Sequence, residues 1–338
     1  MAARLRPSLL AWLGAAFLAL PATAATFPLP GDGSTVVGQL RVVAPSGDNT
    51  LLDIARHFDV GVDEMAWANP GVSLWTPRDA GRVVVPGAFV LPPGPWQGIV
   101  INIPQRRLYF FPAAGRGQAR RVITYPVSIA REGWSTPLGG TRIVAKYKDP
   151  GWLVPRSIQA EHLREEGVEL PTYFPPGPDN PMGMLALRTG FPGIFIHATN
   201  RPWGVGMRTS HGCIHLYPED AAELFPLVGV GTPVRFIDEA LVVGNDRGVQ
   251  VVASFPPVTE YDRRSGEAAG RLPPDRAAKL LAAPQPVIVP LTAESPDDAL
   301  AALPVERYDF PPYDVDANNA ALPGRRSARQ ALMDDAEE

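Results

Sequence analysis

The sequence is poor in three features that would each point to a class of protein. It has one cysteine, Cys213, so no disulfide can form within the chain. It has no surplus of positive charge, because 35 Asp and Glu residues outweigh 31 Lys and Arg residues, and we expect no nucleic-acid partner. After residue 24 it has no apolar run long enough to span a bilayer, so we expect no membrane span in the mature protein.

Proline is abundant instead. The chain has 39 prolines in 338 residues, more than twice the usual share of roughly 5%, which disfavours long helices and favours extended, turn-rich structure. Apolar residues make up 45% of the chain, enough to bury a core. The length allows two domains with additional segments at the ends.

Residues 1–24 have the pattern of a secretory leader. Two arginines precede an apolar run over Leu9–Leu20, and small residues follow up to Ala24. A run of about 12 residues is short for a membrane anchor, the alternative interpretation, because a spanning helix needs about 20. We therefore expect cleavage after Ala24, a mature chain that begins at Ala25, and export to the periplasm of a Gram-negative bacterium.

Composition and turn residues divide the mature chain into five parts. The last of them is acidic and proline-rich, with 15 acidic and 9 basic residues, and we expect it to be largely disordered apart from short helices near 275–283 and 295–302. The expected parts are a linker (25–40), a small module (41–87), the main domain (98–237), a β-rich extension (238–258) and the acidic tail (259–338).

The small module is predicted to run strand, helix, helix, strand. Apolar residues recur at helical spacing from Leu51 to Phe58, a second helix ends at Asn69-Pro70, and a β-type run precedes Pro86. The stretch from Gly47 to Pro70 resembles the LysM module. The resemblance implies binding to N-acetylglucosamine-containing glycans such as peptidoglycan; the alternative is a spacer that has the fold without the sugar site.

The chemistry-bearing residues cluster in one part of the main domain. Three of the five histidines and the only cysteine lie between His197 and His215. Free cysteines are often buried apolar filler. In an exported protein without a second cysteine, however, a free thiol is a chemical liability, which favours a nucleophile at Cys213.

A cysteine nucleophile needs a base or a positive surrounding, because a thiol of pKa about 8.5 is mostly protonated at neutral pH. His197 ends a buried-strand pattern and could be the general base. A helix start at Pro218 would bring a positive helix end near the thiolate. Gly212 would let the backbone bend so that its N–H groups face an oxyanion.

Zinc is the rival use of the same side chains. Histidine and cysteine are zinc ligands, but Cys213 and His215 are closer in sequence than the usual ligand spacing, and no H-E-x-x-H or C-x-x-C motif is present. We therefore expect no metal and no cofactor.

These residues resemble the catalytic motif of the L,D-transpeptidase family with a YkuD-type domain, a histidine followed by Ser/Thr-His-Gly-Cys, here His197 and Ser210–Cys213. The resemblance extends over about residues 98–237 and looks like the periplasmic branch with an N-terminal LysM. It implies a mostly β, α+β domain of sandwich-like form. It also implies that Cys213 is the nucleophile, that His197 is the base and is held by the Ala198 carbonyl, and that His211 and Gly212 line the oxyanion pocket.

The resemblance further implies peptidoglycan stem peptides as substrate, with a flap over the site formed by 152–180. The family commonly has arginine two residues after the cysteine, and this chain has His215 there. A carboxylate could instead be bound by an arginine elsewhere, or by protonated His215, which would raise activity toward acid pH. The expected substrate-binding residues are Ser210, His215, Arg208, Arg188 and Trp203.

The function that follows is a peptidoglycan L,D-transpeptidase. The thiolate would attack the carbonyl of the third stem residue, expel D-alanine and pass the acyl group to an amine: a second stem peptide, a D-amino acid or the lysine of an outer-membrane lipoprotein. Two alternatives stay open, a thiol hydrolase acting on the same substrate and a wall-binding protein without catalysis.

Overall fold

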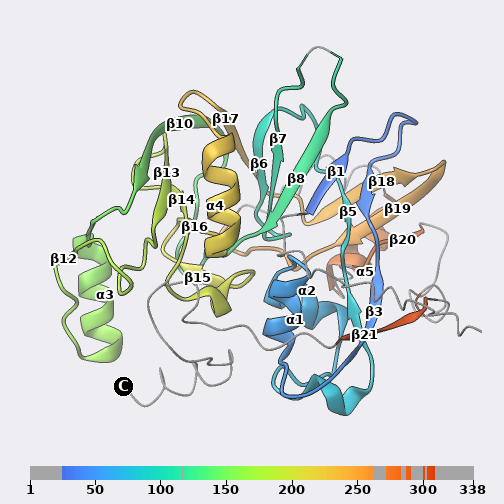
Figure 1. Ribbon diagram of the computed structural model, residues 1–338, viewed down its shortest axis with the longest axis horizontal. Helices are drawn as coiled ribbons and strands as arrows, with labels where there is room; N and C mark the ends of the chain where they lie inside the picture. Colours follow the sequence, from blue (N-terminus) through green and yellow to red (C-terminus); the bar gives the residue numbers. More distant parts are fainter. Residues whose placement is uncertain are drawn as a thin grey trace, which may run out of the picture.

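The computed structural model describes residues 25–115, 117–261, 272–282, 287–290, 300 and 303–308. Most of its elements are strands (Figure 1). No helix in this part of the chain combines the length and apolar character that crossing a bilayer requires.

One nine-stranded mixed sheet organises the molecule. Its central pair, β6 and β17, is parallel, and this pairing joins two groups of strands into a single sheet. The domain expected to be sandwich-like is therefore one continuous sheet, and residues from both of its halves share one buried cluster. In spatial order its strands are β1 (Ala25–Pro28), β8 (Arg121–Pro126), β7 (Arg107–Phe111), β6 (Gly98–Asn102), β17 (Pro233–Ile237), β10 (Gly139–Lys148), β13 (Leu185–Thr189), β14 (Phe195–His197) and β16 (Ile214–His215).

The two faces of the sheet pack against different partners. Strand β6 is buried on both faces: Ile99 and Ile101 belong to the cluster that includes Leu224 of α4 (Pro218–Leu227), whereas Val100 belongs to the cluster of the small module. This explains its uninterrupted apolar pattern. The side-chain alternation of one strand thus connects the two halves of the protein.

The small module has the predicted order of elements: β3 (Arg41–Pro45), α1 (Leu51–His57), α2 (Val62–Ala68) and β4 (Val83–Val85), with a 3₁₀ turn over Pro77–Ala80 before β4. Helix α1 begins with a capping box, in which Thr50 Oγ1 accepts from the Asp53 amide at 3.1 Å and Asp53 accepts from the Thr50 amide at 2.8 Å.

Residues 25–40, expected as a linker, form strands. Strand β1 pairs with β8 at one edge of the main sheet, and β2 (Val36–Gly38) pairs with β5 (Ala88–Val90). Their short runs have no strong alternation. They are stabilised by pairing partners elsewhere in the chain and by packing of Phe27 and Val37 in the cluster of the small module. Residues 238–258 contain the hairpin of β18 (Leu241–Asp246) and β19 (Val249–Ser254).

The acidic tail contains one of the predicted short helices and two strands that were not predicted. Helix α5 (Pro274–Ala282) is found where a short helix was predicted, and β20 (Val289–Pro290) extends the β18–β19 hairpin. Strand β21 (Val305–Tyr308) pairs in parallel with β3, and Tyr308 is fully buried against the module. The helix predicted near 295–302 lies almost wholly outside the described residues.

Two further elements flank the site. Helix α3 (Arg156–Glu166) and the short ladder of β11 (Trp152–Leu153) with β12 (Tyr173–Phe174) form the segment predicted as a flap, far from the small module (Figure 1). Strand β9 (Ile129–Ala130) pairs with β15 (Arg208–Ser210), which leads into the cysteine turn.

Candidate active site

The parallel pair β14–β16 places the histidines and the cysteine on one face of the sheet. In the register, Ile196 lies beside Ile214 and His197 beside His215. If this register is continued by one residue toward the start of each strand, Cys213 lies next to Phe195. Because alternate residues share a face, Cys213, His197 and His215 all face away from the side on which Ile196 and Ile214 pack with α4. Adjacent rows on such a face are roughly 7 Å apart, within reach of an imidazole.

His197 is held in one tautomer. Its ring is buried, and Nδ1 lies 2.5 Å from the Ala198 carbonyl oxygen, the partner that the sequence predicted. Since a carbonyl only accepts, the neutral ring carries its proton on Nδ1 and has a free electron pair on Nε2. Burial lowers the pKa of His197 to about 4, although the carbonyls of Ala198 and Met182 favour the protonated form.

The surroundings of Cys213 favour the protonated thiol. Burial raises its pKa to about 11, and its Sγ lies 3.5 Å from the Gly193 carbonyl oxygen, to which the thiol donates. With His197 neutral as well, the resting site holds a thiol and an imidazole. Burial of both groups therefore opposes the thiolate that was expected from the sequence.

The turn before the nucleophile is built from its own polar groups. The Ser210 hydroxyl donates to the Cys213 carbonyl at 2.6 Å and accepts from the Gly212 amide at 3.1 Å. Gly212 has a φ of 118°, and its carbonyl accepts from Thr136 Oγ1 at 2.7 Å. A Cβ at Gly212 would lie 3.2 Å from the Ser135 carbonyl oxygen, so the position favours glycine for both backbone angle and space.

These contacts refine two predicted roles. Ser210, expected to bind substrate, uses its hydroxyl to shape the turn. Gly212, expected in the oxyanion pocket, already donates its N–H to Ser210. The amides of His211 and Cys213 on either side are then the candidates for an oxyanion.

His211 is bound by the flap. Its Nε2 lies 2.8 Å from Glu161 Oε2 of α3, and its ring stands edge-on to Trp134 with centroids 4.8 Å apart. Trp134 Nε1 donates to the other oxygen of Glu161 at 2.9 Å. Burial lowers the pKa of His211 while Glu161 opposes that shift. Neither Glu161 nor Trp134 was predicted from the sequence, because no local pattern connects either one to a histidine so distant in the chain.

His215 lies against the base. The rings of His197 and His215 have centroids 4.6 Å apart, and burial lowers the pKa of His215 well below its ordinary value, with His197 and His211 adding to the shift. A neutral ring does not attract a carboxylate. The suggested activation at acid pH therefore finds no support in its surroundings.

Of the other expected substrate-binding residues, Arg188 is the best placed. Its β13 position pairs with Phe195, which puts it in line with Cys213 on the same face, and its side chain is exposed. Arg208 is engaged elsewhere: its guanidinium contacts Glu260 at 2.5 Å and the Ala130 carbonyl at 3.1 Å. Trp203 is also engaged, because it packs against Leu52 and Val62 of the small module.

The first residues of the tail contact the loop beside the cysteine turn, and these contacts were not predicted from the sequence. Glu260 accepts from the Gly133 amide at 3.0 Å, and the Tyr261 hydroxyl lies 3.0 Å from the Thr136 amide and 2.9 Å from the Thr136 carbonyl. These residues hold the loop that supports Gly212.

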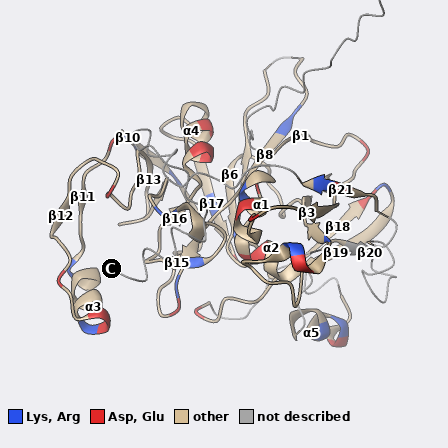
Figure 2. Cartoon of the chain, turned by 60° about the horizontal axis from the view of Figure 1, so that its bottom comes forward, with Lys and Arg blue, Asp and Glu red and all other residues tan. Residues whose placement is uncertain are grey.

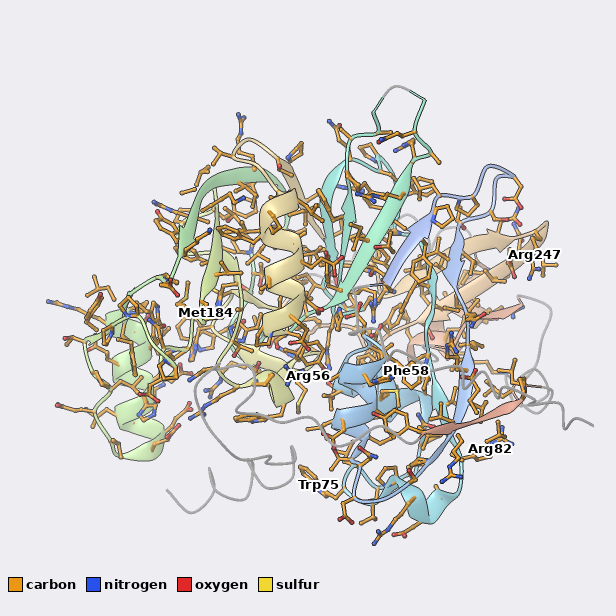
Figure 3. All side chains as sticks on the ribbon, in the orientation of Figure 1. Arg56, Phe58, Trp75, Arg82, Met184 and Arg247 are labelled. Atoms are coloured by element: carbon orange, nitrogen blue, oxygen red, sulfur yellow. The ribbon has the colours of Figure 1, made fainter. Side chains whose placement is uncertain are left out.

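The helix start predicted at Pro218 is present, but its first turn faces the small module. Glu219 accepts from Arg56 of α1 through two bonds of 2.7 Å, and Figure 3 shows Arg56 between α1 and α4. Helix α4 packs on the face of the sheet opposite Cys213. Its contacts therefore do not include the stabilisation of a thiolate that was predicted from the positive end of this helix.

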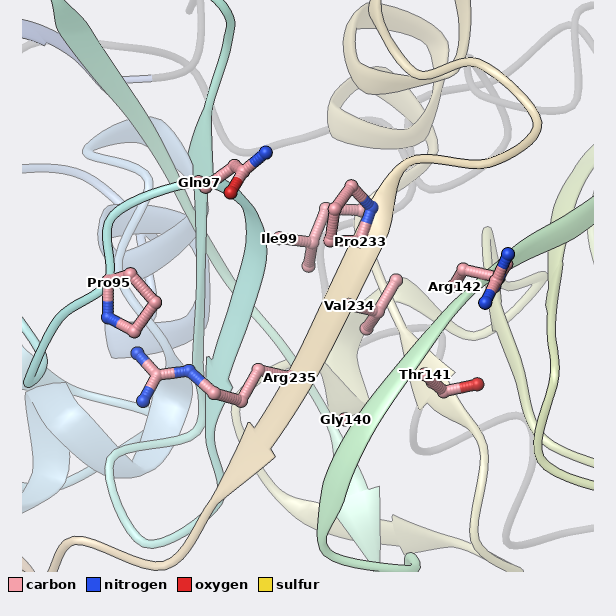
Figure 4. Close-up of a pocket in the computed structure, with 9 residues that line it drawn as sticks. All are labelled: Pro95, Gln97, Ile99, Gly140, Thr141, Arg142, Pro233, Val234 and Arg235. Carbon is pink, nitrogen blue, oxygen red and sulfur yellow. The ribbon is translucent and has the colours of Figure 1, made fainter.

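A cavity of about 350 Å³ lies elsewhere on the sheet, along β6, β17 and β10 (Figure 4). It is lined by prolines, Arg142 and Arg235 among others, and by no residue of the cysteine turn. Within the described ranges, no group of three or more His, Cys, Asp and Glu residues is arranged to hold a metal ion.

Comparisons with known proteins agree with the motif. Residues 97–236 match the family model for the L,D-transpeptidase catalytic domain, YkuD. The chain is 41% identical over 221 residues to "Probable L,D-transpeptidase YbiS" of Escherichia coli, covering 64% of this chain and 70% of that protein. It is 37% identical over 249 residues to "Probable L,D-transpeptidase YcfS" of Escherichia coli, covering 72% and 76%. It is 38% identical over 218 residues to "Probable L,D-transpeptidase ErfK/SrfK" of Salmonella typhimurium, covering 64% and 69%.

Proposed function

The chain belongs to the L,D-transpeptidase family, and we propose that it transfers peptidoglycan stem peptides through a thioester on Cys213. The observation that carries this proposal is the fixed tautomer of His197 on the strand beside the cysteine. With Nδ1–H donated to Ala198, the free Nε2 can accept one proton, which is the task of a general base.

The neutral resting pair determines how the first step proceeds. The pKa values of about 4 for His197 and about 11 for Cys213 make a preformed ion pair unfavourable. Proton transfer from Sγ to Nε2 therefore accompanies attack of the sulfur on the carbonyl of the third stem residue. The carbonyl electron pair moves to oxygen, where the amides of His211 and Cys213 would bind it.

Collapse of that intermediate breaks the bond to D-alanine. The proton on His197 passes to the leaving amine, and the acyl group stays on sulfur as a thioester. An acceptor amine then attacks the thioester and regenerates the thiol. Arg188, in line with Cys213 and exposed, is the proposed contact for a carboxylate of the donor.

We also propose export to the periplasm after removal of residues 1–24, and glycan binding by the small module. The support for the module is its LysM-like sequence and its strand–helix–helix–strand order. Sedimentation of the full-length Cys213→Ala protein with purified sacculi tests this binding without turnover. A protein that stays in the supernatant contradicts it.

The test of the main proposal is the mass of the intact protein after incubation with a disaccharide-tetrapeptide donor. We expect an acyl adduct and released D-alanine for the wild type, and neither for Cys213→Ala. His162→Ala is a matched control, because that histidine lies on α3 and contacts Glu166 at 3.0 Å instead of the reacting groups. A folded, reduced wild type that forms no adduct and releases no D-alanine would refute the proposal.

A further inference from the structure

Two carboxyl groups are buried together where the small module meets the main domain. Asp59 follows α1 and is 6% exposed; Asp220 lies in the first turn of α4 and is 4% exposed. Burial raises the pKa of both carboxyl groups, and the neighbouring Asp59 adds to the rise at Asp220. Asp59 Oδ1 and Asp220 Oδ2 have no hydrogen-bond partner among the described residues. Two carboxyl groups in such a position need a proton or a cation.

The nearby arginines are already paired with other carboxylates. Arg107 is fully buried and binds Glu64 at 2.5 Å, giving Asp59 only a bond to its backbone carbonyl at 3.2 Å. Arg56 donates to the two carboxylate oxygens of Glu219 from its Nε and from one terminal nitrogen. Each of these cations is thus hydrogen-bonded to another carboxylate, although the charge of Arg107 acts on Asp59 and that of Arg56 on Asp220, opposing the rise in the pKa of each.

One further nitrogen reaches the pair. The backbone nitrogen of Ala25 donates to Asp59 Oδ2 at 3.0 Å. Its place is determined by strand β1, in which Ala25 lies opposite Thr124 of β8 at the edge of the main sheet. Ala25 is also the residue at which the mature chain is expected to begin.

We propose that the α-ammonium group created at Ala25 by removal of the leader is the cation of the Asp59–Asp220 pair. Hydrolysis of the Ala24–Ala25 bond consumes one water, leaves a carboxylate on Ala24 and gives Ala25 an amine that is protonated at neutral pH. One neutral N–H donor thereby becomes a group with three donors and a positive charge.

The consequence is a link between maturation and the docking of α4. Asp220 belongs to α4, whose acidic residues are visible in Figure 2, and Asp59 belongs to the small module. An ammonium bound to Asp59 offsets the charge of the carboxyl group that neighbours Asp220, so it favours docking of the helix that follows the cysteine turn against the module. The uncleaved chain lacks this charge and has to keep a proton on the pair.

The sign of the pH dependence follows from the groups that face the pair. A neighbouring carboxylate raises the pKa of the amine above its ordinary value of about 8, so the stabilisation is present at neutral pH and lost as pH rises through the raised pKa. Burial raises the pKa of Tyr125 and of Tyr217, which keeps both phenols neutral in that range. The groups that face the pair are Ala25 and Tyr125 from β1 and β8, Arg107 from β7, Arg56 from α1, and Tyr217, Glu219 and Glu223 at α4.

The experiment starts from the full chain secreted with its own leader. Sequencing of the mature N-terminus reports cleavage directly and should give Ala25. This protein is then compared with one in which a single glycine precedes Ala25, so that the amine is displaced by one residue. We expect thermal unfolding of the glycine-extended protein several degrees lower at about pH 7, with the difference disappearing at about pH 10.

Asp59→Asn identifies the partner of the amine. In that background the added glycine should make no difference to the unfolding temperature. If Asp59→Asn does not fold, titration of the α-amine in the wild type replaces it, and we expect an amine pKa raised by about one unit, equivalent to roughly a tenfold change in the folding constant. A mature N-terminus other than Ala25 overturns the proposal, as does an amine with an ordinary pKa or a glycine effect that survives Asp59→Asn. The acyl-adduct test is independent of these outcomes.

Discussion

Replacing Glu64 by Gln should destabilise the protein more than any change to an exposed ion pair. Glu64 and Arg107 are 3% and 0% exposed, and two bonds of 2.5 and 3.2 Å join them. Glutamine keeps the size and one acceptor oxygen, but it leaves the guanidinium without a counter-charge beneath the ring of Phe89, 3.9 Å away. Breaking a buried pair in this way costs about 3–5 kcal/mol. That is a large part of a typical unfolding free energy of about 5–15 kcal/mol.

Equilibrium unfolding in urea measures this cost, with Glu306→Gln as the matched control. Glu306 pairs with Arg41 at 2.9 Å, but both side chains are exposed, at 43% and 37%, so its loss should cost less than about 1 kcal/mol. Combining Glu64→Gln with Arg107→Met should recover much of the stability, because a neutral apolar side chain needs no partner. If Glu64→Gln costs no more than Glu306→Gln, the reasoning from burial and charge is wrong.

Three predictions concern the site. Glu161→Gln removes the charge that holds His211 and should lower kcat/KM for the donor roughly tenfold, whereas Glu165→Gln in the same helix should leave it unchanged; equal effects would contradict the role of Glu161. Arg188→Ala should raise KM for the donor roughly tenfold with little effect on kcat, and an unchanged KM would exclude it as the carboxylate contact. Because the pKa of His197 is lowered to about 4, the acylation rate measured by mass spectrometry should stay level between about pH 7 and 5 and fall only as pH drops through about 4; a loss that begins near pH 6.5 would contradict this.

Local patterns in the sequence predicted elements whose residues carry their own signals. The helix near 51–58 was predicted from apolar spacing and a short helix was predicted near 275–283, and α1 and α5 are found there. The edge strands could not be predicted in the same way. Strand β1 forms because β8 offers a free edge, and β21 forms because β3 does, with partners about 100 and 260 residues away in sequence.

The features of the site also divide into those that the sequence predicted and those that it could not predict. The order His197, His211, Cys213 indicated a nucleophile with a base, and the strand pattern before His197 predicted its place at the end of a rigid element. The charge state could not be predicted, because burial of the thiol and of the ring depends on the whole sheet. Nor could the sequence predict that Arg208 would form an ion pair with Glu260, since that pair joins the motif to the tail.

The small module completes the core of the domain that carries the site. Val100 and Tyr109 lie on the face of the sheet that packs against the small module. They belong to the same buried cluster as Leu51 and Ile54 of α1. Without the module these apolar side chains would face water, so the module cannot be treated as a detachable binding unit. A glycan bound by it has to use the surface turned away from the sheet, where Trp75 is 38% exposed (Figure 3). Sugar binding and stability therefore have to be measured separately in the whole chain, since removal of the module would abolish both.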